Sequence, residues 1–368
     1  MSIDRPGLGS LGWDREWEDA FALFAADGTR PARVVAVHRE TAIVRDGGPD
    51  ADRPVGVSGA FRFAALARSD FPAVGDWVAL GADDVVSAIL PRRSVFKRMA
   101  ADSSRRGTSL DDEQIMASNI DVALLVAGLD NDFNLRRIER YLAIAMSSQI
   151  TPVVVLNKAD LADDVDGRLV AVDAIAPGVS TVAVSARTGQ GLDALREHLL
   201  PGTTAAILGS SGVGKSTLVN ALLGEDRQAT AEVRDSDSRG RHTTTHRELF
   251  ALPGGALLVD TPGIRALEVL GAEEGVESAF DDVADIAAAC RFSDCRHDGE
   301  PGCAVQAALA DGALSEERLA SHRKLERELA RAAREGDPRA RAEHRRTWKV
   351  IHKSVEEHMN RKYGGGTR

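Results

Sequence analysis

The sequence predicts a multidomain chain: an all-β OB-type barrel first, a doubly wound and mostly parallel α/β sheet in the middle, and a mainly helical region last. Three features of the 368 residues lead to this prediction. Short alternating runs fill 32–81, strand and helix patterns alternate over 120–260, and only helix and loop patterns come after them. Several short strands suit a small barrel, whereas continuous apolar strands alternating with helices favour a parallel sheet covered on both faces.

Shifts in composition give the expected domain boundaries. We expect an N-terminal extension at 1–30, with order only around Trp13 and Trp17. The other expected units are 31–98 (OB-fold barrel), 99–118 (polar linker), 119–270 (α/β domain), 271–345 (C-terminal metal-binding domain) and 346–368 (basic tail).

In the barrel, strands are expected where apolar residues alternate with polar ones between Gly, Pro and Asp. They are "ARVVAVH" (32–38), "TAIVR" (41–45), "GAFRFAAL" (59–66) and "GDWVALG" (75–81). OB-type barrels often hold single-stranded nucleic acid, but many do not, and the pattern leaves both options open.

In the α/β region, apolar runs predict buried strands and a 3.6-residue periodicity predicts the helices between them. The expected strands are "IDVALLVAGL" (120–129), "TPVVVLN" (151–157), "VSTVAVSA" (179–186), "TTAAILG" (203–209) and "GALLVD" (255–260). The expected helices are "LRRIERYLAIAMSS" (135–148), "LDALREHL" (192–199) and "KSTLVNALLG" (215–224).

The segment "GSSGVGKST" matches a phosphate-binding loop, with a strand before it and a helix after it, which a chance glycine-rich turn would lack. Its glycines let backbone N–H groups point at phosphates, and the helix N-terminus adds partial positive charge. Lys215 is expected to reach the β- and γ-phosphates, and Ser216 to bind Mg²⁺. The expected phosphate-binding residues are Gly209, Ser210, Ser211, Gly212, Val213, Gly214, Lys215, Ser216 and Thr217.

A second loop, "NKAD", predicts which base is bound. The Asp160 carboxylate can accept hydrogen bonds from N1–H and the exocyclic amine of guanine. Adenine presents an acceptor at N1, and the mismatch would cost about 1–3 kcal/mol. The backbone of "SAR", after the next strand, can contact the base carbonyl. The residues expected to contact the base are Asn157, Lys158, Ala159, Asp160, Ser185 and Ala186.

Two segments beyond the phosphate loop are expected to respond to the γ-phosphate. In "DTPG", Asp260 is placed to hold Mg²⁺ and the Gly263 N–H to sense the γ-phosphate. The polar stretch 238–248 carries Thr243, Thr244 and Thr245, one of which can complete the Mg²⁺ shell. We assign Mg²⁺ to Ser216, Thr244 and Asp260.

Hydrolysis of a bound nucleoside triphosphate needs a group that positions the attacking water. Ile264 stands where many GTPases carry a glutamine, and its side chain cannot form a hydrogen bond. His242 is the nearest candidate, with backbone groups as the alternative. The expected catalytic residues are therefore His242 and Thr244.

The base loop precedes the phosphate loop, the reverse of the usual order. In an open parallel sheet, the ligand loops all lie at the carboxyl ends of the strands. A chain cut at one connection and rejoined at its old ends keeps that edge. The sequence therefore predicts a circularly permuted domain with an intact site.

All three cysteines of the chain lie within fourteen positions, together with a histidine. Three thiolates and an imidazole suit tetrahedral Zn²⁺, and with no further ligand evident we expect one closed structural site. The alternative is buried thiols packed as small apolar groups. The expected ligands are Cys290, Cys295, His297 and Cys303.

Seven segments together resemble the RsgA (YjeQ) family of circularly permuted GTPases that depend on the small ribosomal subunit. They are "PAVGDWV" (72–78), "FNLRRIERYL" (133–142), "VVVLNKADL" (153–161), "LGSSGVGKSTLVNAL" (208–222), "GRHTTTHREL" (240–249), "VDTPGIR" (259–265) and "CRFSDCRHDGEPGCAV" (290–305).

The resemblance implies an OB barrel, a permuted GTPase domain and a zinc domain. It also implies hydrolysis of GTP to GDP and phosphate, stimulated by the 30S subunit, in late maturation of that subunit. The implied partners are the 30S subunit and its 16S rRNA, and the implied catalytic histidine is His242. Two alternatives stay open: a nucleotide-gated rRNA-binding scaffold with incidental hydrolysis, and a permuted GTPase that acts on the large subunit.

The charge is distributed unevenly along the chain. Its net charge is -10, yet residues 316–368 carry fifteen Lys and Arg against nine Asp and Glu. A basic tail on an acidic body suits a polyanionic partner, although a solvated helix is the simpler alternative. The sequence contains no secretion signal and no apolar run of eighteen residues, so we expect a cytoplasmic protein without a membrane partner. We further expect a monomer.

Overall fold

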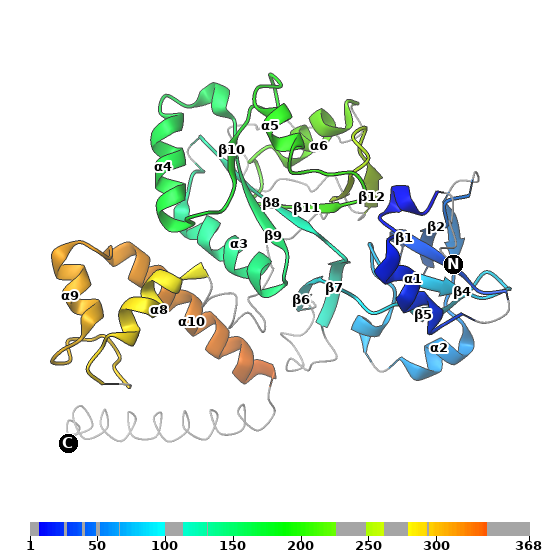
Figure 1. Ribbon diagram of the computed structural model, residues 1–368, viewed down its shortest axis with the longest axis horizontal. Coiled ribbons are helices and arrows are strands. Elements are labelled where there is room, and N and C mark those ends of the chain that lie inside the picture. The colour runs from blue at the N-terminus through cyan, green and yellow to red at the C-terminus, as the bar shows by residue number, and fades with distance from the viewer. Residues whose placement is uncertain are drawn as a thin grey trace, which may run out of the picture.

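A computed structural model describes most of the chain (Figure 1). The described ranges are 7–25, 28–38, 41–48, 52–65, 67–99, 113–130, 132–225, 248–260, 279–292 and 294–336. Some sequence expectations lie outside these residues: His242, Thr243, Thr244, Thr245, Gly263 and the tail 346–368.

The central sheet confirms the expected mostly parallel, doubly wound architecture. Its strands, in spatial order, are β10 (Thr181–Ala183), β9 (Thr151–Asn157), β8 (Val122–Gly128), β11 (Thr204–Gly209), β13 (Leu257–Asp260) and β12 (Glu248–Ala251). The neighbours from β10 to β13 are parallel, and β12 runs antiparallel to β13.

Helices cover both faces of this sheet, as Figure 1 shows. They are α3 (Leu135–Ser147), α4 (Val165–Ile175), α5 (Leu192–Arg196) and α6 (Lys215–Leu223), with the short η5 (Ala159–Leu161) after β9. Alternate residues of β8 supply both faces, because successive side chains of a strand point to opposite sides. Leu125 packs with α3 and α4, whereas Leu124 packs with α5 and α6.

The N-terminal β region forms a second group of strands. They are β1 (Arg30–His38), β2 (Thr41–Arg45), β3 (Arg53–Val55), β4 (Trp77–Leu80) and β5 (Val86–Ile89). β1 pairs antiparallel with β2 and β4, β2 pairs with β3, and β4 pairs with β5. A parallel bridge between Val57 and Val86 connects the two ends of this series, and a pairing of Ala36 with Glu248 joins β1 to β12.

One expected strand is wrong. "GAFRFAAL" forms the helix α2 (Gly59–Ala64) instead, followed by η2 (Arg68–Asp70). The hydroxyl of Ser58 caps the helix by accepting a hydrogen bond from the Phe61 N–H at 3.1 Å. A serine N-cap stabilises a first helical turn by about 1 kcal/mol. The strand-like alternation of Phe61 and Phe63 offers no stabilisation that exceeds this cap. Phe63 is 92% exposed, so it does not belong to the buried face that a strand here would have had.

Two further segments lie beside the N-terminal strands. β7 (Glu113–Ser118), within the expected linker, pairs with β6 (Val95–Met99). The N-terminal extension forms η1 (Gly9–Leu11) and α1 (Arg15–Ala22). Trp13 lies between these two elements and Trp17 lies in α1, where local order was expected. The ring centroids of Trp13 and Trp77 lie 4.7 Å apart, edge to face.

Arg33 is a buried cation where the N-terminal extension, the N-terminal strands and the central sheet meet. It is 2% exposed and donates to the carbonyls of Leu11, Gly75 (3.3 Å) and Asn119 (3.2 Å). It also donates to the Thr204 hydroxyl, at the start of β11, at 2.8 Å. Burial lowers the pKa of its guanidinium to about 10, so it stays charged at neutral pH.

The C-terminal region is helical, as expected. It comprises α8 (Asp281–Ala288), α9 (Ala304–Asp311) and α10 (Glu316–Gly336), and α10 lies against α3 (Figure 1). Across the described ranges, no helix combines the length and the apolar character that a bilayer span requires.

We predict that Arg33→Ala lowers the free energy of unfolding by about 2–4 kcal/mol, because it leaves buried carbonyls without donors. Urea unfolding followed by tryptophan fluorescence measures this directly, since Trp13, Trp17 and Trp77 pack at this junction. Arg30→Ala is the matched control: its ion pairs with Asp46 and Asp84 are partly exposed, so it should cost under about 1 kcal/mol. Equal unfolding midpoints for the two variants would contradict the prediction.

Candidate functional site

The predicted phosphate loop lies between β11 and α6, at the carboxyl edge of the sheet. Gly212 and Gly214 have φ values of +83° and +90°, a region that favours glycine. The ammonium of Lys215 folds back over the loop and donates to the carbonyls of Gly209, at 2.9 Å, and Ser210. The segment therefore adopts a compact loop that its own lysine closes through two backbone carbonyls.

Asn157 ties three loops of the site together. Its amide Nδ2 donates to the Val213 carbonyl in the phosphate loop at 2.8 Å. Its Oδ1 accepts the Ala186 N–H, in the "SAR" loop, at 3.0 Å. The side chain is 2% exposed, and a Cβ on Gly214 would come within 2.4 Å of its Nδ2. Only glycine at 214 allows this close approach.

The base loop is held in the same way. Lys158 adopts a left-handed backbone (φ 66°) and pairs its ammonium with Asp130, at the end of β8. Burial raises the pKa of the Asp130 carboxyl, but the hydrogen bonds from Lys158 and from the Asp132 N–H, together with the charge of Lys158, outweigh burial and lower the pKa below its usual value. The Ala159 N–H donates to the Val184 carbonyl at 3.0 Å. Asp160 is left exposed beside the loop edge, and Ser185 is buried.

Asp260 ends β13, directly beside β11, and is 9% exposed. Ser216 begins the helix after the phosphate loop, so both described Mg²⁺ candidates lie at the same edge of the sheet. The remaining candidate, Thr244, and the residues expected to sense phosphate or place water, Gly263 and His242, lie outside the described residues.

Arg137 and Asp132 contact the predicted phosphate loop and were missed from the sequence. Arg137, on α3, donates from Nη1 to the Ser210 hydroxyl at 2.8 Å and to the Asp132 carboxylate at 2.7 Å. Ser210 in turn donates to Asp132 at 2.5 Å. Its side chain therefore points toward α3, which leaves only its backbone for a phosphate. No local pattern signals this contact, because Arg137 and Ser210 lie 73 positions apart.

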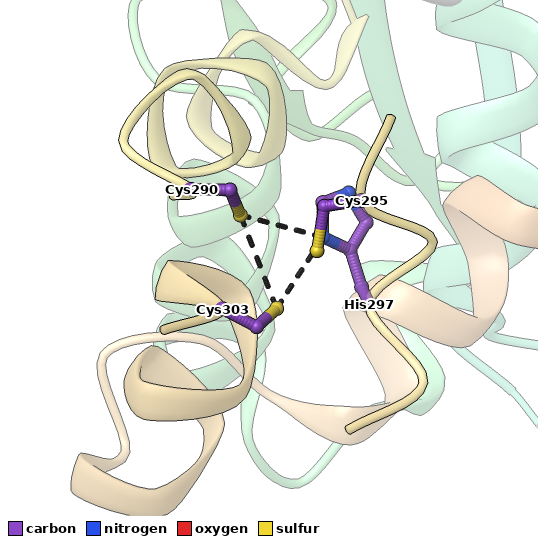
Figure 2. A group of neighbouring side chains, drawn as sticks. All are labelled: Cys290, Cys295, His297 and Cys303. Carbon is purple, nitrogen blue, oxygen red and sulfur yellow. Dashed lines mark hydrogen bonds between the residues drawn. The ribbon is translucent and has the colours of Figure 1, made fainter. Parts of the chain in front are cut away.

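The four expected metal ligands do come together (Figure 2). Their donor atoms all lie within 4.8 Å of one another. The Cys290 and Cys303 sulfurs are 3.9 Å apart, and each lies 3.5 Å from His297 Nδ1. Tetrahedral bonds of about 2.1–2.3 Å separate their ligand atoms by about 3.4–3.8 Å. The spacing of these atoms therefore fits a tetrahedral ion, with Cys295 as the fourth donor.

The chain around these ligands is fixed by its own hydrogen bonds. The His297 carbonyl accepts from Gln306 Nε2 at 2.6 Å and from Arg323 Nη2 at 2.8 Å. The Glu300 carboxylate accepts the N–H groups of Arg296 and Asp298 at 3.0 and 2.8 Å. Backbone hydrogen bonds of this kind lower the pKa of Glu300 to about 2. The ligand loop is thus held by α9, α10 and a carboxylate that stays ionised.

Comparison with known proteins places these features in one family. A model described as RsgA GTPase matches residues 89–270. The chain is 48% identical over 360 residues to the small ribosomal subunit biogenesis GTPase RsgA of Opitutus terrae, covering 94% of this chain and 96% of that protein. It is 44% identical over 370 residues to the protein of the same name from Streptomyces coelicolor, covering 97% and 96%.

Two solved structures share the fold. YjeQ from Thermotoga maritima is 29% identical, with a TM-score of 0.59 over 82% of this chain and 99% of that one. YloQ, described as a circularly permuted GTPase, is 23% identical, with a TM-score of 0.57 over 82% and 95%. The second likeness supports the fold alone.

We predict that Asn157→Ala weakens nucleotide binding about 10- to 100-fold, because both the phosphate loop and the "SAR" loop lose a buried hydrogen bond. Equilibrium titration with a fluorescent guanine nucleotide measures this. Gln190→Ala removes an exposed amide near the same edge and serves as the control, with unchanged affinity. Wild-type affinity in Asn157→Ala would show that the loops hold their positions without this amide.

Proposed function

The chain belongs to the RsgA family of GTPases, and we propose that it binds the 30S ribosomal subunit and hydrolyses GTP in the late maturation of that subunit. The observation that carries this proposal is the Asn157 amide, which joins a base loop to a phosphate loop that comes after it in sequence. The small subunit as partner comes from the relatives, which are named small ribosomal subunit biogenesis GTPases. The chain matches them along nearly their whole length.

We propose that the nucleotide enters with its phosphates over residues 209–217. Lys215 then exchanges its two backbone carbonyl acceptors for phosphate oxygens, which carry full charge and make stronger acceptors. A Mg²⁺ ion bound with the nucleotide would neutralise developing charge, held by Ser216, Asp260 and Thr244. At the other end, Asp160 and the backbone of Ser185 and Ala186 select guanine.

Positioning of the attacking water is assigned to His242, with Thr244 beside it. Ile264 offers no hydrogen bond where many GTPases carry a glutamine, so the water needs another acceptor. An imidazole can orient water through one ring nitrogen. Docking of the subunit would then bring this imidazole to the attacking water, which accounts for stimulation by the partner.

We further propose that the N-terminal strands form an OB-type barrel, within the domain boundaries predicted from the sequence. The supporting observations are the antiparallel pairings of β1 with β2 and β4 and the parallel bridge from Val57 to Val86. These link the strands into the ring that a five-stranded, partly open barrel requires.

One structural Zn²⁺ per chain is proposed at Cys290, Cys295, His297 and Cys303. Soft thiolate ligands and near-tetrahedral spacing favour zinc over harder cations. The basic C-terminal sequence suits 16S rRNA as the contacted component. We also propose that the protein acts as a monomer in the cytoplasm.

We predict that GTP turnover rises in the presence of 30S subunits, that Lys215→Ala abolishes it, and that His242→Ala lowers the stimulated rate about 10²–10³-fold with little change in GTP affinity. Phosphate release is the measurement, with 50S subunits as the control. Turnover insensitive to 30S would favour a scaffold with incidental hydrolysis, and stimulation by 50S alone would favour a large-subunit factor.

We predict about one equivalent of zinc per purified chain and its loss in Cys295→Ser. Because binding at such a site contributes folding free energy, chelation should lower the unfolding midpoint. Metal analysis and thermal unfolding test both statements. Metal-free protein with an unchanged unfolding midpoint would exclude the zinc assignment.

A further inference from the structure

Helix α3 contacts the phosphate loop on one side and the C-terminal helices on the other. Arg137 and Glu139, two residues apart on this helix, make the two contacts. At about 100° per residue they point to nearly opposite sides, separated by a rise of about 3 Å. Figure 1 shows α3 between the central sheet and α10.

At the phosphate loop, three side chains close a ring of hydrogen bonds. Arg137 donates to both Ser210 and Asp132, and Ser210 donates to Asp132. The Ser210 carbonyl accepts from Lys215 on the other side of the loop. Ser210 is therefore held from two directions, and a displacement of α3 acts directly on the loop that carries Lys215.

At the C-terminal region, Glu139 is 3% exposed and accepts from Arg318 Nη1 at 2.8 Å and from the Ser321 hydroxyl. Arg318 also binds the Asp282 carboxylate, at 2.8 and 3.1 Å, and its guanidinium lies 4.1 Å from the centre of the Phe280 ring. Burial lowers the pKa of Arg318, but these carboxylates outweigh it and raise the pKa above its usual value.

A buried ion pair of this kind tolerates little displacement, because separating the partners leaves a charge without compensation. Besides the sheet on which it packs, α8 and α10, which carry Asp282 and Arg318, thus hold α3 in position. A second pair, Arg140 with Glu328 at 2.7 Å, adds a more exposed contact between the same two helices, α3 and α10.

We propose that α3 couples the phosphate loop to the C-terminal domain, with Arg137 as a positioning residue of that loop and Glu139 as the residue through which the C-terminal domain holds the helix. The proposal rests on the nucleotide site proposed above. It adds a path by which a partner bound to the C-terminal domain affects that site. By linkage, a partner that shifts α10 changes the affinity for nucleotide, and nucleotide changes the affinity for that partner by the same factor.

A double-mutant cycle tests this coupling in the full, metal-loaded chain. The measured quantity is the dissociation rate of a fluorescent GDP from wild type, Arg137→Met, Glu139→Gln and the double variant. Glu139→Gln keeps the shape of the side chain but removes its charge, and we expect it to speed release about three- to thirtyfold. In the Arg137→Met background the same change should have less than a twofold effect, because the link to Ser210 is already absent.

Conservative and control variants sharpen the result. Arg137→Lys keeps one donor for Ser210 or Asp132 and should restore most of the Glu139→Gln effect, which a purely structural role would not predict. Arg136→Ala, at an exposed position of the same helix, should release GDP at the wild-type rate. If Glu139→Gln does not fold, Ser321→Ala removes only one donor to Glu139 and takes its place in the cycle.

Equal effects of Glu139→Gln in both backgrounds, or wild-type release in the folded single variants, would overturn the coupling. These outcomes differ from a failure of the proposed function, in which the wild-type chain itself would bind no guanine nucleotide. If Lys215→Ala abolishes GDP binding while the effects of Arg137→Met and Glu139→Gln are additive, the proposed nucleotide site stands. Only the role of α3 as the link is then excluded.

Discussion

The proposed nucleotide site depends on one buried amide. Asn157 must donate to the phosphate loop and accept from the "SAR" loop at the same time, which a carboxylate or an aliphatic side chain cannot do. The close approach at Gly214 is a consequence, because a Cβ there would meet the amide nitrogen. The contact joins residues that lie 56 positions apart, so it requires neighbouring loops in space but no particular order along the chain. The reversed order of base loop and phosphate loop is compatible with an intact site for this reason.

The permutation also decides which part of the chain comes after the sheet. In the present order, β13 is the last strand of the sheet along the chain, and α8 and the cluster of Cys290, Cys295, His297 and Cys303 come after it. The C-terminal helices pack on α3, which belongs to the first half of the α/β domain, through Glu139 and Arg318. The described C-terminal helices are therefore linked to the proposed site through α3, a contact that the order of the elements along the chain does not reveal.

The sequence predicted those features that depend on local pattern. Continuous apolar strands such as β8, the phosphate loop and the clustered cysteines are visible in short windows of residues. "GAFRFAAL" was misassigned because its alternation resembles a strand, while the deciding group is the Ser58 cap outside it. Arg33, Arg137 and Arg318 could not be assigned, since each is defined by partners far away in the chain. The sequence gives the charge of an arginine, whereas its burial and its hydrogen-bond partners are known only from the fold.

The buried guanidinium of Arg33 also constrains how the protein is made. Domains generally fold in order as they leave the ribosome, and residues 7–38 emerge early. Arg33 nevertheless requires the Asn119 carbonyl and the Thr204 hydroxyl, which are synthesised much later. Until then the first strands can pair among themselves, but this charge lacks half of its native partners. The N-terminal part of the chain thus completes its fold only after more than half of the protein has been translated.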